Sequence, residues 1–316
     1  MITLINKDRF IYDLEYRVPD IIKEYQTTGK VEISVNHEGI CLRKVKFYDL
    51  LDYVCDNFDF EKFKITIYTS NILEKHEFYN IKNSYSHWLY ETKKTIPIDY
   101  VAFKNDNLLT LGCFVGKINW NRLILLSFLY KNFKDQILLT CHYRHEDAQK
   151  LQSELTELNF YDSYNLVNAV NFLQNCPLTL GESFETYTIG SPEHLTILNQ
   201  YNSFFAELII ETYVMGNTFF PTEKTLRPII AETPFIVMGP VNYLDNLKKL
   251  GFKTFSHWWD ESYDQWEGPY RIEKIKMLLT KIMSWSQERL QQTLKEMQTV
   301  LEYNRNFYLH EINTND

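Results

Sequence analysis

The chain contains few of the residues that break regular structure. Among its 316 residues there are 10 Gly and 9 Pro, which excludes a low-complexity or loop-dominated chain. It also has no run of about 18 apolar residues, so we expect no membrane-spanning helix. The first residues, MITLINKDRF, carry charges too early for a secretory signal peptide.

Cysteine is scarce, and its spacing forms no framework. The cysteines are odd in number and include no CxxC pair: Cys41, Cys55, Cys113, Cys141 and Cys176. This pattern favours free, buried thiols in a reducing compartment over a disulfide or zinc framework. We therefore expect a cytoplasmic protein.

Familiar catalytic and nucleotide-binding motifs are missing as well. The sequence has no P-loop, no Ser/His/Asp set and no GxGxxG, and an NAD-binding Rossmann domain usually carries the last of these. The net charge of −8 disfavours a general binder of the nucleic-acid backbone, because such proteins are normally basic.

Core-forming residues, by contrast, are abundant, at 45% hydrophobic and 16% aromatic. Short apolar runs alternate with helical spacings, which is typical of α/β folds. The runs predict strands at 31–35, 64–69, 108–115, 136–141, 204–210, 234–238 and 252–255. The spacings predict helices at 48–58, 121–133 and 243–250, the last capped by Gly251, and one or two long helices within 270–309.

These elements predict an α/β protein made of two α/β units and a long C-terminal helix. The first domain is expected over residues 1–104 and the second over 105–285. The terminal helix, within 286–316, is expected to pack back on the body. Beyond a helix near 146–158, residues 146–200 fit no firm pattern.

Residues 203–239 form the most informative stretch. The apolar run Phe204–Ile210 ends at Glu211, a loop leads to Thr222-Glu223-Lys224, and a short helix precedes a second apolar run. Two buried parallel strands joined in this way place the loop at the carboxyl edge of the sheet, where open α/β folds bind ligands.

The residue types in this loop suit a ligand with phosphates and hydroxyls. Thr222 is a natural N-cap, and the free amides of a helix start attract phosphate. Lys224 adds a point charge, and Glu223 can accept hydrogen bonds from two vicinal hydroxyls. In the alternative interpretation Glu223 only favours the helix dipole and Lys224 is solvated. Pro228 would kink this helix or delay its start.

Two segments carry a resemblance to a known group of enzymes. FPTEK at 220–224, followed by PFIVMG at 234–239, resembles the donor-site motif of fucosyltransferase-type and exostosin-like glycosyltransferases. Upstream, LGCFVGK at 111–117 with NRL at 121–123 resembles the strand, loop and arginine-bearing helix of the same families. The resemblance covers residues 107–285, and the N-terminal hundred only loosely.

The resemblance implies a GT-B architecture, in which two Rossmann-like domains face a cleft and the C-terminal one holds a nucleotide-sugar. It implies that Arg122 contacts the donor diphosphate, Glu223 the ribose or sugar hydroxyls, and Lys224 the phosphates. The alternative for Arg122 is a pairing with a nearby acid. The donor site predicted in this way comprises Gly116, Lys117, Arg122, Glu211, Thr222, Glu223 and Lys224.

Sugar transfer also needs a base for the acceptor hydroxyl. Glu38 is the first candidate and His37 the second, because both follow the strand at 31–35 on a loop closed by Gly39. Equally, both residues can be ordinary polar turn residues. Asn71 and Glu74, after the next strand, are candidates for acceptor contacts.

An acidic cluster, Asp260, Glu261 and Asp264, follows His257-Trp258-Trp259. Oxygen ligands suit Mg²⁺ or Mn²⁺. However, no Asp-x-Asp follows a strand, as it does in metal-dependent transferases of the other major sugar-transferase fold. We therefore expect a solvated loop here, with or without Glu261 near the donor sugar, and an enzyme that needs neither metal nor resident cofactor.

These observations predict a Leloir-type glycosyltransferase that moves a sugar from a nucleotide-diphosphate donor to an acceptor hydroxyl. The acceptor is expected to be a glycan or, less in keeping with the net charge, a hydroxymethylated DNA base in a virus-like setting. The alternative is a catalytically inactive relative that serves as a carbohydrate-binding or scaffold protein. Its contact surface would be the aromatic residues Tyr85, His87, Trp88, Tyr90, Trp258 and Trp259. The donor base and sugar, the stereochemical outcome and the oligomeric state are left open.

Overall fold

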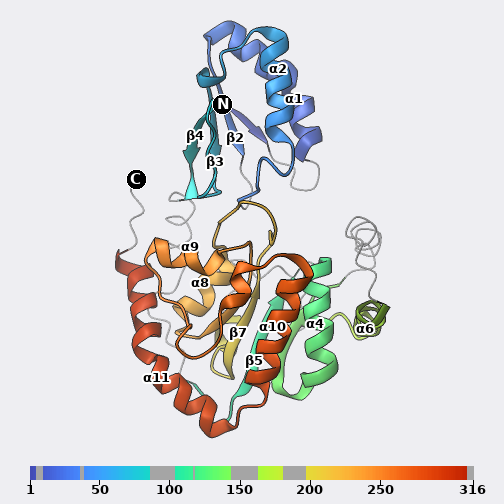
Figure 1. Ribbon diagram of the computed structural model, residues 1–316, viewed down its shortest axis with the longest axis vertical. Helices are drawn as coiled ribbons and strands as arrows, with labels where there is room; N and C mark the ends of the chain where they lie inside the picture. Colours follow the sequence, from blue (N-terminus) through green and yellow to red (C-terminus); the bar gives the residue numbers. More distant parts are fainter. Residues whose placement is uncertain are drawn as a thin grey trace. The chain divides into compact units, whose positions relative to one another are not determined.

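The computed structural model describes residues 1–4, 10–35, 39–85, 104–116, 118–143, 163–180 and 197–311. These residues form two compact units (Figure 1). Unit 1 takes those of Met1–Lys94 and Thr212–Thr222, and unit 2 takes those of Thr95–Glu211 and Glu223–Ile312. Each unit contains a four-stranded parallel sheet with helices, so the predicted α/β class is confirmed.

Unit 1 is built on a sheet whose strands follow one another in chain order, β1-β2-β3-β4. The strands are β1 (Ile2–Leu4), β2 (Val31–Val35), β3 (Ile65–Thr69) and β4 (Asn80–Asn83). Helices α1 (Phe10–Thr28) and α2 (Phe47–Phe58) connect the first three. Because right-handed crossovers in one direction leave the same face of a sheet, both helices cover one face, as Figure 1 shows. The apolar core of unit 1 lies between that face and the helices.

Unit 2 holds the second sheet, with the strand order β6-β5-β7-β8. Its strands are β5 (Leu109–Val115), β6 (Ile137–Cys141), β7 (Phe204–Ile210) and β8 (Phe235–Met238). Its helices include α4 (Trp120–Phe133), α6 (Ser163–Leu173), α8 (Glu223–Ile230), α9 (Tyr243–Leu250), α10 (Gly268–Met283) and α11 (Gln287–Asn306). From β5 the chain first adds β6 on one side and later β7 and β8 on the other, so the strand order reverses between β5 and β7. Such a reversal is the switch point at which open α/β sheets bind ligands.

The chain between β7 and α8 belongs to unit 1. Strand β7 ends at Ile210 in unit 2, Thr212–Thr222 groups with unit 1, and the chain returns to unit 2 at Glu223. Within unit 1, Tyr213 packs against the apolar core. The predicted domain boundary at residue 104 does not account for this segment, because it assigns Thr212–Thr222 to the second domain.

Most of the predicted elements are present with ends within one residue of the expected ones. This holds for β2, β3, β5, β6, β7 and β8, and for α2, α4 and α9. Gly251 caps α9 with its N–H bonded to the carbonyls of Leu247 and Lys248, as expected. The predicted C-terminal helical region forms two helices, α10 and α11.

The predicted strand at 252–255 is wrong, because these residues form no strand. The Asn304 carboxamide of α11 instead accepts a hydrogen bond from the Lys253 N–H at 2.8 Å and donates to the Lys253 carbonyl at 2.9 Å. A buried side chain thus satisfies the backbone groups that a neighbouring strand would otherwise bind. Strands β1 and β4 and helix α1 were not predicted.

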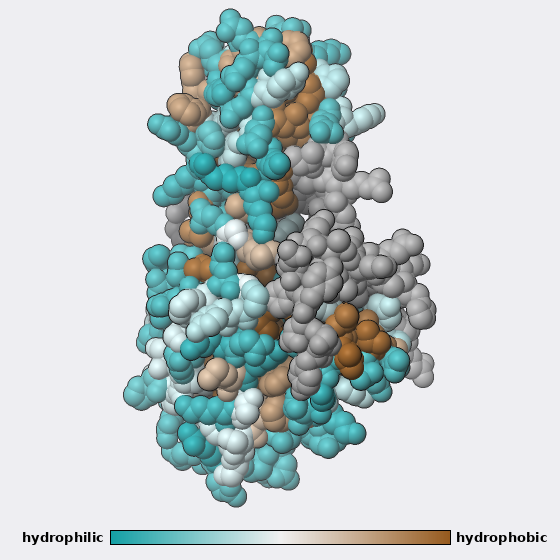
Figure 2. Space-filling view, turned by 45° about the vertical axis from the view of Figure 1, so that its right-hand side comes forward, coloured by the Kyte–Doolittle hydropathy of each residue, from teal (hydrophilic) through white to brown (hydrophobic). Residues whose placement is uncertain are grey.

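Helix α6 has one buried and one exposed apolar face. Ala169 and Phe172 are buried, whereas Leu166, Val167 and Val170 are 37%, 58% and 49% exposed. Figure 2 shows the resulting apolar area over this helix. Contiguous apolar area of this kind is uncommon on a helix whose other face already packs against the body.

The thiols follow the expectation from the sequence. All five cysteines are free, four of them are buried, and Cys176 is half-buried. Within the described ranges, no helix is long and apolar enough to cross a membrane.

The Gly251→Ala variant should lose stability for two separate reasons. The residue has φ 109°, and a Cβ there would lie 2.4 Å from the Phe307 ring of the C-terminal helical region. Backbone strain costs about 1 kcal/mol, and overpacking adds roughly 1–3 kcal/mol. Gly29→Ala is the matched control, because it has φ 70° but nothing within 4 Å of the added methyl group. Urea unfolding of both variants measures the difference; equal losses would mean that the overlap with Phe307 costs nothing.

Candidate functional site

The switch point of the unit 2 sheet determines where the candidate site lies. Gly116 directly follows β5 and Glu211 directly follows β7, so both come at the carboxyl ends of the two strands between which the order reverses. Crevices in α/β sheets open at this edge, and helix N-termini point toward it. Of the predicted donor residues, those in the described ranges follow β5 and β7.

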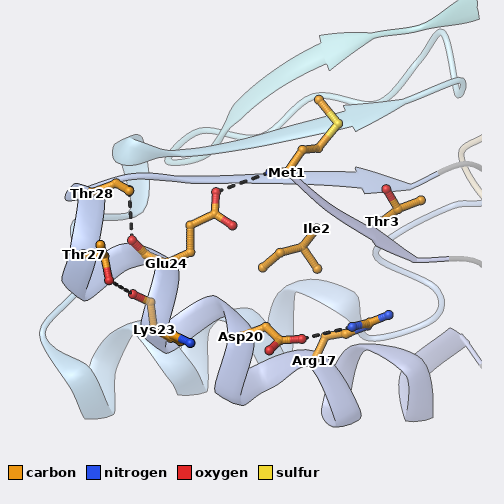
Figure 3. Close-up of a pocket in the computed structure, with 9 residues that line it drawn as sticks. All are labelled: Met1, Ile2, Thr3, Arg17, Asp20, Lys23, Glu24, Thr27 and Thr28. Carbon is orange, nitrogen blue, oxygen red and sulfur yellow. Dashed lines mark hydrogen bonds and ion pairs between the residues drawn. The ribbon is translucent and has the colours of Figure 1, made fainter.

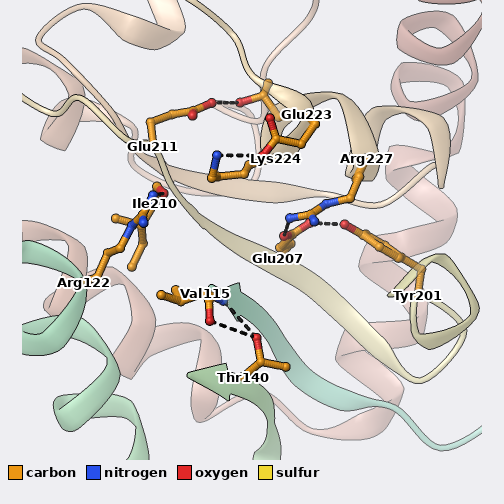
Figure 4. A network of polar contacts seen from close by, with 11 residues as sticks. Val115, Arg122, Thr140, Tyr201, Glu207, Ile210, Glu211, Glu223, Lys224 and Arg227 are labelled. Carbon is orange, nitrogen blue, oxygen red and sulfur yellow. Dashed lines mark hydrogen bonds and ion pairs between the residues drawn. The ribbon is translucent and has the colours of Figure 1, made fainter. Parts of the chain in front are cut away.

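Arg122 links the helix after β5 to the end of β7. It lies in the first turn of α4, whose N-cap Asn119 accepts a hydrogen bond from the Arg122 N–H at 3.0 Å. Its guanidinium Nη2 donates to the Ile210 carbonyl at 3.1 Å, and the residue is only 5% exposed. The predicted Arg122 therefore lies at the switch point, directly beside the strand end that carries Glu211 (Figure 4).

Glu211 fixes the helices that follow β7. Its Oε1 accepts hydrogen bonds from the Thr225 hydroxyl of α8 and the Tyr243 hydroxyl of α9, each at 2.8 Å. The two hydroxyl oxygens lie 2.7 Å apart, and Glu211 is 2% exposed. This carboxylate thus holds the start of both helices against the end of the strand.

The start of α8 presents the charged pair of the FPTEK motif. The helix begins at Glu223, directly after Thr222, and runs through Pro228 to Ile230, so the proline does not delay its start. Lys224 Nζ donates to Glu223 Oε1 at 2.8 Å, and the two side chains are 17% and 19% exposed. Thr222 is buried. The pair therefore remains partly exposed, whereas Thr222 beside it is enclosed. Figure 4 shows the two side chains at the start of the helix.

Three predicted residues lie outside the described ranges: His37, Glu38 and Lys117. Gly39, which closes the loop of His37 and Glu38, is described and has φ 67°. Asn71 and Glu74, the candidates for acceptor contacts, are 0% and 8% exposed. Their side chains bond each other at 3.2 Å, and both are engaged within unit 1.

A charged network that the sequence analysis missed lies under the α8 pair. Glu207, in the middle of β7, is 1% exposed; it accepts a short hydrogen bond from the Tyr201 hydroxyl and lies 3.7 Å from the Arg227 guanidinium. Arg227 itself is 2% exposed on α8. Figure 4 shows the three side chains converging between α8 and the sheet.

Lys104 lies close enough to join this network electrostatically. Its ammonium donates to the carbonyls of Tyr201 at 2.6 Å and Phe204 at 2.9 Å and to the Thr233 hydroxyl at 2.9 Å. Burial lowers the pKa of Lys104 to about 7, and Glu207 opposes this only in part. Burial likewise raises the pKa of Glu207 to about 7, with Arg227 and Tyr201 acting in the opposite direction.

One signal in the sequence could have revealed this network. The run FFAELII is apolar at six of its seven positions, and the exception is Glu207. An acid in a strand buried on both faces needs a buried partner of opposite charge or a proton. Its partners lie outside the strand at Tyr201 and Arg227, so the sequence could predict that a partner exists but not which residue it is.

The acidic cluster after Trp259 divides into separate structural roles. Asp264 binds Arg271 at 2.7 Å and Glu261 accepts from the Thr254 hydroxyl at 2.7 Å, whereas Asp260 accepts from the Ser262 N–H and hydroxyl. Burial raises the pKa of both Asp264 and Glu261. Among the described residues, no group of three His, Cys, Asp or Glu side chains could hold a metal ion.

The aromatic residues of the binding-module alternative lie partly in the core. Tyr85 is 5% exposed and its ring meets Phe220 edge-on, with centroids 5.3 Å apart. Trp259 is 3% exposed and packs against Phe205 and Phe255. His87, Trp88 and Tyr90 lie outside the described ranges. Tyr85 and Trp259 therefore stabilise the interior and do not form a contact surface.

A separate hollow of about 520 Å³ lies in unit 1 between β1 and α1 (Figure 3). Two ion pairs lie along it: Arg17 contacts Asp20 at 3.0 Å, and Glu24 contacts the N-terminal amine at 3.6 Å. Met1 and Thr28 line it, and these precede β1 and β2, so the hollow lies at the amino edge of the sheet. Because α/β sheets bind ligands at the opposite edge, we do not assign the site there.

Replacement of Glu207 by Gln should change how stability depends on pH. The fold raises the pKa of Glu207 from 4.5 to about 7. The stability that Glu207 contributes in its protonated form is therefore complete at low pH and is lost as pH rises toward 7. Between pH 5 and 7 the wild type should lose on the order of 2 kcal/mol of unfolding free energy relative to Glu207→Gln. The exposed Glu296 on α11 provides the control, Glu296→Gln. Parallel pH profiles for the wild type and Glu207→Gln would contradict the assignment.

Comparison of the chain with models of known protein families, with curated proteins and with solved structures found no match in any of the three.

Proposed function

We propose that the chain is a glycosyltransferase that transfers a sugar from a nucleotide-diphosphate donor to an acceptor hydroxyl. One observation carries the proposal. Arg122 from the helix after β5 and the Glu223-Lys224 pair from the helix after β7 meet the carboxyl ends of the same two strands, where the strand order reverses. Cations and a solvent-reachable carboxylate at this edge are the groups that a phosphate-linked sugar requires.

The donor diphosphate would be bound by charge and by backbone amides. Helices α4 and α8 both start at the carboxyl edge of the sheet, so their first N–H groups favour an anion there. Lys224 would turn from Glu223 toward the phosphates, and Arg122 would supply a fixed positive charge beside the end of β7. Such preorganised charges stabilise the leaving diphosphate as the bond to the sugar breaks.

Glu223 would then be free to recognise hydroxyl groups. A carboxylate has two oxygens, and each can accept hydrogen bonds from vicinal hydroxyls of a ribose or sugar. Because Glu223 is partly exposed, it can exchange its contact with Lys224 for contacts with donor hydroxyls. No buried ion pair is lost in this exchange. Glu223 is therefore the residue on which the proposed donor recognition depends.

The acceptor side of the proposal rests on unit 1 and the loop after β2. Glu38 is the proposed base that removes the proton of the acceptor hydroxyl, with His37 as the second candidate. A glycan is the proposed acceptor, and the net charge of −8 weighs against duplex DNA. Two Rossmann-like units agree with a GT-B enzyme, and this finer architecture is part of the proposal.

Glu223→Ala should remove most of the transfer activity and leave the fold intact. Loss of its charge-assisted hydrogen bonds to donor hydroxyls should lower kcat/KM by roughly 100-fold. Release of nucleoside diphosphate from the donor measures turnover, and circular dichroism checks the fold. The control Glu296→Ala removes a carboxylate from the exposed face of α11. Wild-type turnover in Glu223→Ala would refute the donor assignment.

Nucleoside diphosphates should stabilise the protein against heat. Ligand at 100 times its Kd adds about 2.7 kcal/mol of stability, which raises the Tm by several degrees. A thermal-shift screen with GDP, UDP and TDP and the corresponding sugar donors, and with the monophosphate CMP for comparison, therefore identifies the base. The absence of a shift with every nucleotide would favour the scaffold alternative over the enzyme.

A further inference from the structure

The segment Thr212–Thr222 connects the two ends of the proposed donor site, yet it belongs to unit 1. Glu211 precedes it and Glu223 follows it. The loop between a strand and the helix that follows it commonly lies on the surface and makes few contacts of its own. This segment instead has a dense set of contacts with the loops that follow β2 and β3.

Asn71, just after β3, makes the central contacts. Its Oδ1 accepts a hydrogen bond from the Phe219 N–H at 2.9 Å, and its Nδ2 donates to the Asn217 carbonyl at 3.0 Å. The backbone continues the pairing, because the Ile72 N–H donates to the Phe219 carbonyl at 3.0 Å. One carboxamide thus binds a backbone donor and a backbone acceptor of the same segment, as a paired strand would.

The remaining hydrogen-bonding capacity of the Asn71 side chain is also used. Its Oδ1 accepts from the Leu73 N–H at 3.1 Å, and its Nδ2 donates to Glu74 Oε2 at 3.2 Å. The residue is fully buried. A carboxamide has two donors and two lone pairs on its oxygen, so all of these groups have a partner here.

Gly39 and Tyr85 hold the segment on either side of Asn71. The Thr218 hydroxyl donates to the Gly39 carbonyl, and a Cβ on Gly39 would lie 2.3 Å from Phe220. The Tyr85 hydroxyl donates to the Pro221 carbonyl at 3.3 Å. The segment is therefore anchored up to the residue before Thr222.

Glu74 makes the identity of residue 71 chemically critical. It is 8% exposed and accepts hydrogen bonds from the Tyr48 hydroxyl and the Leu42 N–H in addition to Asn71. Burial raises the pKa of Glu74, and its hydrogen-bond donors oppose this. A second carboxylate at position 71 would remove one of those donors and add a like charge beside it.

We infer that Asn71 is a positioning residue for the proposed donor site, and this inference rests on the proposed function. It holds Asn217 and Phe219 in unit 1. It thereby fixes the segment that lies between Glu211 and Glu223. Without this anchor the segment would have to become ordered when the donor binds. The accompanying loss of conformational entropy would weaken donor binding. Asn71 has no contact with the donor in this scheme.

The test compares Asn71→Asp with the wild type in calorimetric titrations with UDP and with GDP between pH 5.5 and 8. At pH 8 the carboxylate repels Glu74 and cannot donate to Asn217, so we expect roughly tenfold weaker binding. Toward pH 5.5 a proton shared by the two acids removes their repulsion, and the affinity should recover in part. The control Asn80→Asp changes an exposed asparagine of β4 that bonds Thr66; its affinity should follow the wild type at every pH.

Hydrogen exchange of the ligand-free proteins gives a second readout, independent of the donor. Amides at 217–219 should exchange faster in Asn71→Asp than in the wild type or in Asn80→Asp. Unchanged exchange would overturn the anchoring role, and faster exchange with unchanged affinity would overturn the positioning role. Failure of the wild type to bind either diphosphate would overturn the proposed function and, with it, the positioning role at the donor site; the exchange data would then still report the anchor alone.

Discussion

Complete burial of β7 is the constraint on which unit 2 depends. All seven residues of this strand are buried, yet Glu207 lies in its middle. An isolated carboxylate in such a place is unstable, so the strand requires Arg227 on α8 and the Tyr201 hydroxyl close by. Because one of these partners is on α8, the pair also fixes that helix against the strand. The contact of Glu207 with Arg227, one helical turn along α8 from Glu223, thus determines the position of the Glu223-Lys224 pair.

The elements that the sequence predicted correctly have a regular apolar period. Strands β5 and β7 are short runs of apolar residues, and α2 and α9 show helical spacing, so local pattern was enough. Strand β4 is polar at nearly every position and half exposed or exposed throughout, and helix α1 contains Pro19, so neither carries that signal. The error at 252–255 has another cause, since its pattern suited a strand but Asn304 took the backbone groups of Lys253. A contact made from 51 residues away is not encoded in the local spacing.

The same distinction applies to the candidate site. The start of α8 at Glu223 could be predicted, because Thr222, the acid and the lysine are adjacent in the sequence. The partners of Glu211 could not, since Tyr243 lies 32 residues further along the chain. Arg122 was found through a family resemblance, and its hydrogen bond to Ile210 shows where it lies but required the strand order to be known. Local chemistry therefore indicated the candidate residues, and the sheet topology shows which of them lie close together.

The connection between β7 and α8 is also held by contacts between residues that are far apart in the sequence. A free loop at this position would leave Glu223 and Lys224 to sample many arrangements, and a ligand would have to select one of them. Here the carboxamide of Asn71, the absent side chain of Gly39 and the ring of Tyr85 hold the connection before any ligand arrives. Its conformational entropy is lost during folding, when unit 1 forms its own core. The two anchors thus act within separate units: Asn71 fixes the connection in unit 1, and the pairing of Arg227 with Glu207 fixes α8 against β7 in unit 2.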